Sequence, residues 1–381
     1  ASVRLLQLEQ QQNVLSQYNS NLTAAKNSLT QEEVTLNSVN TVLQRVRELA
    51  VQAGNGALDP QDRKAIAAEL GEREDELLSL MNTRNARGEY LFSGFQGKTQ
   101  PFVRGADGSY SYQGDEGQRK LQVASSLNVP ISDNGKSIFE SVTNAGRLNS
   151  ALATEPTGST LRVSAPLVQD EVAFSAFPAA GIEIVFNDAP DERTYRVFEY
   201  GADTSTAPPL ATGRMDDDAD KSDKLVFSGV ALHLDGVSVG GERAVVLPGK
   251  ISIDSGTGAI TTGPVANKQG ILDTIASLRM ALESPATSSN GVRDTVAVAL
   301  TNLDHGMVSV DQARGNIGAR LNVIETTQTD NEDVALVNKG VQAELRELDY
   351  AEALSRLSMQ TVVLEAAQQS YVKIAGLSLF N

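Results

Sequence analysis

The chain has 381 residues, enough for two or three domains with a sizeable core. Its formal net charge is −16, from 48 acidic and 32 basic residues, which excludes nucleic acid as a partner and a polybasic membrane anchor. No cysteine is present, so disulfides, thiolate metal sites and cysteine nucleophiles are excluded. No apolar run approaches the roughly 20 residues that a membrane-spanning helix requires.

The first part of the chain predicts one long helix that ends near Ala53. Neither proline nor glycine interrupts residues 3–53, and leucine recurs every seven residues. Apolar side chains at this spacing lie along one face of a helix, which needs other helices to cover it. Because the pattern starts without an N-cap residue, we expect further residues to precede Ala1. The leucine face consists of Leu8, Leu15, Leu22, Leu29, Leu36 and Leu43.

A second helix is predicted over residues 60–84. The Gly-Asn-Gly sequence at residues 54–56 ends the first helix, because these residues readily adopt the left-handed conformation. Asp59 can cap the new helix, and Pro60 suits its first position. The short connection predicts that the two helices pack antiparallel.

A β-hairpin is predicted within residues 88–125. The glycine-rich residues 105–108 separate two short strands at residues 101–103 and 110–112. A further short strand is predicted at residues 121–123.

Residues 150–267 predict a small β-sandwich or barrel, because strand patterns follow one another without a helical pattern between them. One hairpin joins a strand at residues 182–186 to a returning strand at residues 194–200. A second hairpin is predicted at residues 232–239, with an Asp-Gly turn at its centre.

Three further helices are predicted, at residues 271–282, 296–324 and 330–374. Arg314 lies within the apolar stripe of the middle one. Either its stem packs and its guanidinium group reaches solvent, or it forms a buried ion pair that sets the helix register. The stripe contains Leu303, Val310, Ile317 and Leu321.

These elements predict an α+β protein with several domains. A discontinuous helical rod domain is built from both chain ends, residues 1–149 and 268–381, and ends in a C-terminal helix at about residues 357–381. A β-rich outer domain at residues 150–267 is inserted between them. The two ends must lie side by side to bury their apolar stripes, so the leucine face and the Leu303 stripe are predicted to form one intramolecular seam.

No catalytic, cofactor or metal site is predicted, and we expect no enzymatic activity. The Gly-Lys-Thr at residues 97–99 lacks the first glycine of a phosphate-binding loop, because Phe92 stands there. The acidic residues 216–223 begin like a calcium loop, but lysine and phenylalanine replace its turn glycine and its last ligand. His233 and His305 have no motif partner, so a structural role is favoured for both.

Three stretches resemble the flagellin superfamily. Residues 46–56, Val-Arg-Glu-Leu-Ala-Val-Gln-Ala-Gly-Asn-Gly, and residues 366–380 are similar to flagellins and their relatives in general. The sequence Gly-Glu-Tyr-Leu-Phe-Ser-Gly at residues 88–94, followed by Pro-Phe at residues 101–102, resembles the hook-associated protein 3 family of hook–filament junction proteins. Residues 150–267 carry no such similarity.

The resemblance implies a structural adaptor that joins the flagellar hook to the filament outside the bacterial cell. Its implied partners are the first hook-associated junction protein, flagellin and further copies of itself in a ring. The implied route of secretion is the flagellar type III export apparatus, with an export chaperone at the C-terminal helix, and no cofactor, nucleic acid or membrane is implied.

The resemblance also implies that the N- and C-terminal segments pair as a coiled coil, and that the C-terminal helix lacks part of its mate in this chain. The candidate subunit contacts are Leu357, Leu364, Tyr371, Ile374, Leu377, Leu379 and Phe380.

Two alternative functions remain open. The chain could be a flagellin filament subunit, which the sequence at residues 88–102 disfavours. A glycan-binding or enzymatic module in the β insertion is the other alternative, and only Tyr195, Tyr200 and the acidic residues 216–223 point to it.

Overall fold

The computed structural model describes residues 2–154 and 156–380, except for the side chains of residues 377–380. Its residues form two compact units, which we describe separately. One unit contains residues up to 30, residues 120–131 and residues from 317 onward, and the other contains residues 31–119 and 132–316. The long helices α1 (Ser2–Gly54) and α5 (Ser289–Phe380) contribute to both units.

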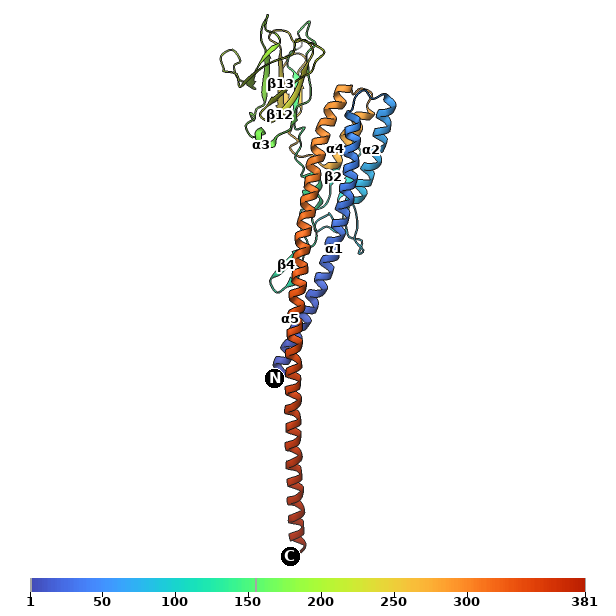
Figure 1. The fold of residues 1–381 in the computed structure, drawn as a ribbon, viewed down its shortest axis with the longest axis vertical. Coiled ribbons are helices and arrows are strands. Elements are labelled where there is room, and N and C mark those ends of the chain that lie inside the picture. Colours follow the sequence, from blue (N-terminus) through green and yellow to red (C-terminus); the bar gives the residue numbers. More distant parts are fainter. Residues whose placement is uncertain (1, 155, 381) are drawn as a thin grey trace. The chain divides into compact units, whose positions relative to one another are not determined.

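Four helical segments form the bundle of the larger unit: the end of α1, α2 (Pro60–Met81), α4 (Ile271–Glu283) and the start of α5 (Figure 1). The Asp59 carboxylate accepts a hydrogen bond from the Asp62 amide at 2.7 Å and so caps α2 as predicted. The helix ends at Met81 rather than at residue 84. The side chain of Asn82, which follows the helix, bonds both the amide and the carbonyl of Phe102 and so ties the end of α2 to the strand that begins there.

In this bundle α1 and α5 run antiparallel. Asn40 bonds Asp311 at 2.8 Å and Arg47 bonds Asp304 at 2.8 Å, so residue numbers fall along α5 as they rise along α1. The bundle core is made of aliphatic side chains. Their burial stabilises the bundle through the hydrophobic effect. Buried members include Leu36, Leu43, Leu49, Ile66, Leu70, Leu77, Leu278, Leu303 and Val310.

The predicted hairpin is present as β1 (Phe102–Arg104) and β2 (Tyr110–Tyr112). A single π-helical turn, η1 (Lys136–Glu140), follows later in the chain. Phe139 from this turn packs edge-on against Phe92 and Phe102, with ring centroids 5.1 and 5.8 Å apart.

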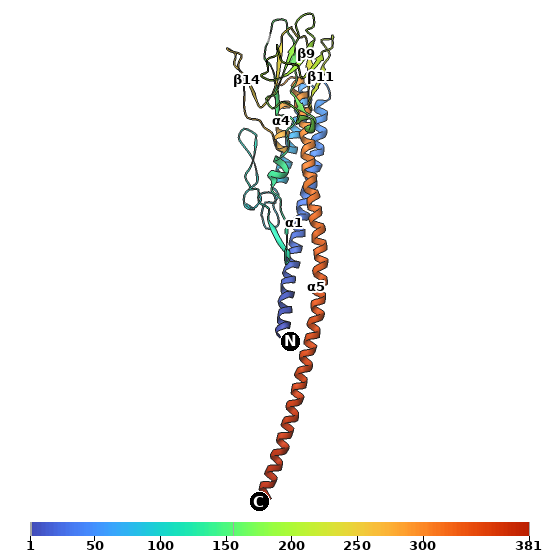
Figure 2. The same cartoon turned by 90° about the vertical axis from the view of Figure 1, so that its left-hand side faces the viewer.

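Residues 148–248 form a β-sandwich (Figure 2), which is one of the two predicted architectures. One antiparallel sheet has the order β10 (Ala211–Arg214), β9 (Thr194–Glu199), β8 (Ile182–Phe186), β13 (Arg243–Pro248) and β5 (Leu148–Leu152). The other has β11 (Asp223–Phe227), β12 (Val230–Asp235) and β6 (Arg162–Val163), with β7 (Leu167–Val168) also paired to β12. Outside the sheets lie α3 (Glu171–Phe174) and a two-stranded hairpin of β14 (Ile251–Ile253) and β15 (Ile260–Thr262).

The hairpin predicted at residues 232–239 is wrong. Gly236 has φ +86°, and the amide and carbonyl of the next residue, Val237, bond Thr160 instead of β12. The real hairpin joins β11 to β12 through Ser228 and Gly229, with φ values of 45° and 81°. Two consecutive left-handed residues are the geometry of the tight turn that matches strand twist.

The predicted break between helices at residues 324 and 330 is also wrong, because α5 is continuous from Ser289 to Phe380. The residues between them, Glu-Thr-Thr-Gln-Thr, contain neither glycine nor proline. Threonine lowers helix propensity by well under about 1 kcal/mol, too little to end a helix that packs on one side.

In the smaller unit, a hairpin of β3 (Lys120–Ala124) and β4 (Leu127–Pro130) lies against both long helices. The side-chain amide of Asn21 on α1 donates to the Gln122 carbonyl at 2.7 Å, and that of Asn331 on α5 donates to the Val123 carbonyl at 3.0 Å. Leu22, Leu29, Val123, Ile317 and Ile324 form its buried core.

Candidate assembly surfaces

The residues predicted to form the helix seam lie at different depths. Within the larger unit, Leu36, Leu43, Leu303 and Val310 are buried. Within the smaller unit, Leu22, Leu29 and Ile317 are buried, whereas Leu8, Leu15 and Leu321 are partly exposed. Burial therefore decreases toward the start of α1.

Arg314, which the sequence places in the apolar stripe of α5, forms an ion pair with Glu33 of α1 at 3.0 Å. Both side chains retain about a third of their exposure, 30% and 31%. The pair is therefore partly solvated, and its worth is nearer to that of a surface pair, about 1 kcal/mol or less.

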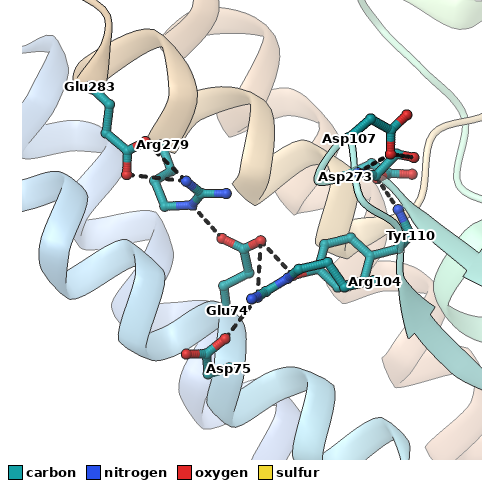
Figure 3. A network of polar contacts seen from close by, with 9 residues as sticks. Glu74, Asp75, Arg104, Asp107, Tyr110, Asp273, Arg279 and Glu283 are labelled. Carbon is teal, nitrogen blue, oxygen red and sulfur yellow. Dashed lines mark hydrogen bonds and ion pairs between the residues drawn. The ribbon is translucent and has the colours of Figure 1, made fainter.

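A buried carboxylate, Glu74 of α2, is the centre of a polar network in the bundle (Figure 3). Arg279 of α4 bonds one of its oxygens at 2.7 Å. The Tyr110 hydroxyl donates to the other oxygen, which Arg104 also approaches at 3.5 Å. Arg104 makes its shorter bond to Asp75, at 2.7 Å.

This network ties the β1–β2 hairpin to α2 and α4. The Tyr110 amide adds a bond to Asp273 of α4 at 3.0 Å. Burial raises the pKa of the Tyr110 hydroxyl, and Glu74 adds to that shift. The hydrogen bond to Glu74 raises the pKa of Arg279, and the hydrogen bond to Tyr110 raises the pKa of Arg104, so both arginines are charged beside Glu74. Sequence reasoning did not select Glu74, although it occupies a position of the apolar stripe of α2 between Leu70 and Leu77.

The C-terminal part of α5 carries an apolar surface that nothing covers among the described residues. Every residue from 351 to 374 is exposed. Of the predicted contact residues, Leu357, Leu364, Tyr371 and Ile374 are 58–74% exposed. The side chains of Leu377, Leu379 and Phe380 lie outside the described residues. Exposed apolar surface of this extent is typical of interaction sites.

The remaining motifs make local contacts. In the acidic stretch, Asp216 and Asp218 each accept a hydrogen bond from an amide two residues on, so their carboxylates turn toward the backbone. His305 donates through Nδ1 to the Thr143 carbonyl at 2.9 Å, while His233 is exposed. The loop at residues 94–99 is not followed by a helix.

Within residues 2–154 and 156–380, no group of three or more histidine or carboxylate side chains is placed to hold a metal ion. In the same part of the chain, no helix combines the length and apolar character that crossing a membrane requires.

Comparison with known proteins associates the chain with the bacterial flagellum. Residues 2–97 match the family model described as the bacterial flagellin N-terminal helical region. A stretch of 159 residues is 34% identical to flagellar hook-associated protein 3 of Escherichia coli (strain K12), covering 42% of this chain and 47% of that protein. The chain thus matches about half the length of this relative.

The crystal structure of flagellar hook-associated protein 3 from Legionella pneumophila is similar over 90% of this chain and 98% of that one. Its TM-score is 0.70 and its sequence identity 26%. The predicted resemblance is confirmed: this chain is similar to flagellar hook-associated protein 3. Similarity to Flagellin B of Vibrio cholerae (strain O395) is shorter, with 36% identity over 75 residues and 20% of each chain.

Proposed function

We propose that this chain is a structural subunit of the bacterial flagellum that joins the hook to the filament and has no enzymatic activity. The observation that carries the proposal is the likeness to hook-associated protein 3, which extends over nearly the whole solved chain from Legionella pneumophila. The sequence similarity to flagellins is shorter, covering 20% of the chain for Flagellin B of Vibrio cholerae and 30% for Flagellin B of Vibrio anguillarum, which favours the junction role over that of a filament subunit.

The proposed partners are the first hook-associated junction protein, flagellin and other copies of this chain. The chain would be exported through the flagellar type III apparatus and function outside the cell, with an export chaperone bound to the C-terminal part of α5. Support for protein partners comes from residues 351–374, whose exposed leucine, valine, isoleucine and tyrosine side chains require cover in the working state.

Complementation tests this proposal. The chain is expressed in one strain that lacks hook-associated protein 3 and in another that lacks flagellin. We expect motility to return in the first strain only. Rescue of the flagellin-deficient strain alone would make the chain a filament subunit, and rescue of neither would contradict a flagellar structural role.

Substitutions on α5 sharpen the test. Leu364→Glu and Tyr371→Glu place charge on the exposed apolar surface, so we expect loss of rescue with an unchanged melting temperature of the isolated protein. Gln369→Glu adds the same charge to an exposed polar position on the opposite face of the same helix and should preserve rescue. Equal rescue by all three variants would show that this surface is not used.

A further inference from the structure

A cleft of about 900 Å³ lies between the smaller sheet of the sandwich, with the neighbouring strand β5, and the first turns of α5. All of its lining residues belong to the larger unit of the structure. The volume lies near the upper end of the range of roughly 300–1,000 Å³ that is typical of pockets for small molecules. The cleft is therefore large enough for a ligand of several rings.

Strand β12 supplies polar side chains to one wall of the cleft because of its alternation. Leu232 and Leu234 are buried in the sandwich core, so His233 and Asp235 point to the opposite face of the sheet, where both line the cleft. The strand register places Arg162 of β6 opposite Asp235, and its Nη2 atom donates to Asp235 Oδ2 at 3.0 Å. These two charges satisfy each other, and a ligand must be recognised mainly by other groups.

Three polar side chains of α5 line the other wall: Asn290, Arg293 and Asp294. Asp294 Oδ2 accepts a hydrogen bond from the Ala165 amide at 3.0 Å, which ties the segment after β6 to the helix. Among the described residues, nothing donates a hydrogen bond to Asp294 Oδ1, and the side chains of Asn290 and Arg293 form no hydrogen bond or ion pair. One acceptor and two donor groups are thus available to a ligand.

The Asp294 carboxylate is short of hydrogen-bond donors. Burial raises the pKa of this carboxyl above its ordinary value, and the Ala165 amide and His233 offset only part of that shift. The ionised carboxylate has therefore lost more hydration than the surrounding protein restores. A hydroxyl group in the cleft would supply a donor to it.

The charged side chains that line the cleft cancel one another. Arg162 and Arg293 stand against Asp235 and Asp294. A ligand that carries a net charge would meet like charges in this lining, whereas a neutral polar ligand would not. Each sugar hydroxyl donates one hydrogen bond and accepts two, so adjacent hydroxyls can bond a carboxylate and a guanidinium group together.

We propose that this cleft binds a neutral sugar, with Arg293 and Asn290 donating to its hydroxyl oxygens and Asp294 accepting from a hydroxyl group. The C–H groups of the sugar would pack on Leu152 and Val163, which also line the cleft and are partly exposed. Among residues 2–154 and 156–380, no aromatic side chain lines the cleft for a sugar ring to stack on, so we expect dissociation constants of roughly 1 mM.

An extended peptide fits this cleft less well than a sugar. Strand β6, at the edge of the smaller sheet, has only two residues, too few to pair with an added strand. Of the residues at which the sequence suggested glycan binding, Ser222 of the acidic stretch lines the cleft, whereas Tyr195 is buried in the sandwich core. The inference goes beyond the proposed junction role and does not depend on it.

Saturation-transfer NMR on the purified full chain tests the proposal. The probes are glucose, galactose, maltose and lactose, with galacturonate as a charged comparison and glycerol as the control for an adventitious additive. We expect at least one neutral sugar to bind with a dissociation constant of roughly 1 mM, and galacturonate to bind more weakly than galactose. A disaccharide that binds more tightly than its monosaccharide assigns the cleft to the end of a glycan, and equal affinity assigns it to a free sugar.

Substitutions locate the binding site. Arg293→Gln should weaken sugar binding roughly tenfold, as expected for loss of a charged hydrogen bond, whereas Arg87→Gln, at an exposed arginine outside the cleft, should not. Ala297→Phe fills the cleft from an exposed position of α5 and should abolish binding. Val308→Phe, at an exposed position of the same helix outside the cleft, is its control.

Four results would overturn the proposal: no neutral sugar binds, glycerol is saturated as strongly as the sugars, galacturonate binds more tightly than galactose, or Arg293→Gln and Ala297→Phe bind like their controls. Melting temperatures of the purified variants separate lost binding from lost folding.

Discussion

Two stretches of α5 carry the same pattern of apolar side chains and differ completely in burial. In residues 296–313, Val296, Leu303 and Val310 are at most 5% exposed. In residues 351–374 every side chain is exposed, and Leu357 is 59% exposed. The pattern predicts that a helix face will be covered, but whether the cover lies in the same chain or in another molecule depends on what is within reach.

The largest expected difference between the two stretches is in amide hydrogen exchange of the isolated protein. Amides in residues 296–313 should exchange only when the bundle opens, whereas those in residues 351–374 lack tertiary contacts and open locally. The opening free energies should differ by roughly 5 kcal/mol or more. Strong protection throughout residues 351–374 would contradict this prediction, because it would mean that the isolated chain covers this face.

The stability of the bundle that buries residues 296–313 depends on Glu74. Glu74→Ala leaves Arg279 and the Tyr110 hydroxyl without their partner, and we expect a loss of about 3–5 kcal/mol in unfolding free energy. Glu74→Gln retains an acceptor for Tyr110 and should lose less. Denaturant unfolding measures both, with Glu72→Ala on the exposed face of α2 as the control. Equal stability of the two alanine variants would show that the network contributes nothing.

A matched pair of leucines compares the two stretches directly. Leu303→Ala removes a side chain that is 1% exposed and should cost about 2–5 kcal/mol, the transfer free energy plus a cavity. Leu357→Ala removes one that is already in water and should cost under about 0.5 kcal/mol in the isolated protein. Thermal unfolding with the two variants in parallel decides this, and a similar cost for both would mean that residues 351–374 are covered.

The sequence predicted those elements whose signals are local. Asp59 and Pro60 mark the start of α2, and the alternating residues 182–186 mark a strand, because capping and alternation depend on a few neighbouring residues. The Ser228–Gly229 turn also carries a local signal, a Ser-Gly pair between two strands, but the Asp-Gly at residues 235–236 carries a stronger one. Pairing of Val237 with Thr160, a contact between distant residues, decided against it.

The candidate surfaces were predictable only in part. The apolar face of α5 at residues 351–374 could be predicted from its sequence pattern. Its exposure could be predicted as well, because few residues of this chain are free to cover it. The Glu74 network depends on Arg279, which lies far away in sequence on another helix. A glutamate in an apolar stripe was the available signal, and it does not identify its partner.

The smallest expected effect is the pH dependence of stability that Glu140 of η1 produces. Burial, followed by repulsion from Asp273, raises the pKa of Glu140 above its ordinary 4.5. The folded state therefore favours the protonated form, so its contribution is full below pH 4.5 and is lost as the pH rises through the folded-state pKa. Glu140→Gln removes that loss. Its free energy of unfolding should match that of the wild type near pH 4 and exceed it at pH 7. The difference at pH 7 should be less than about 1 kcal/mol, because Glu140 is only partly buried. Glu72→Gln is the exposed control. A Glu140→Gln variant that is less stable than the wild type at pH 7 would mean that the ionised carboxylate stabilises this region.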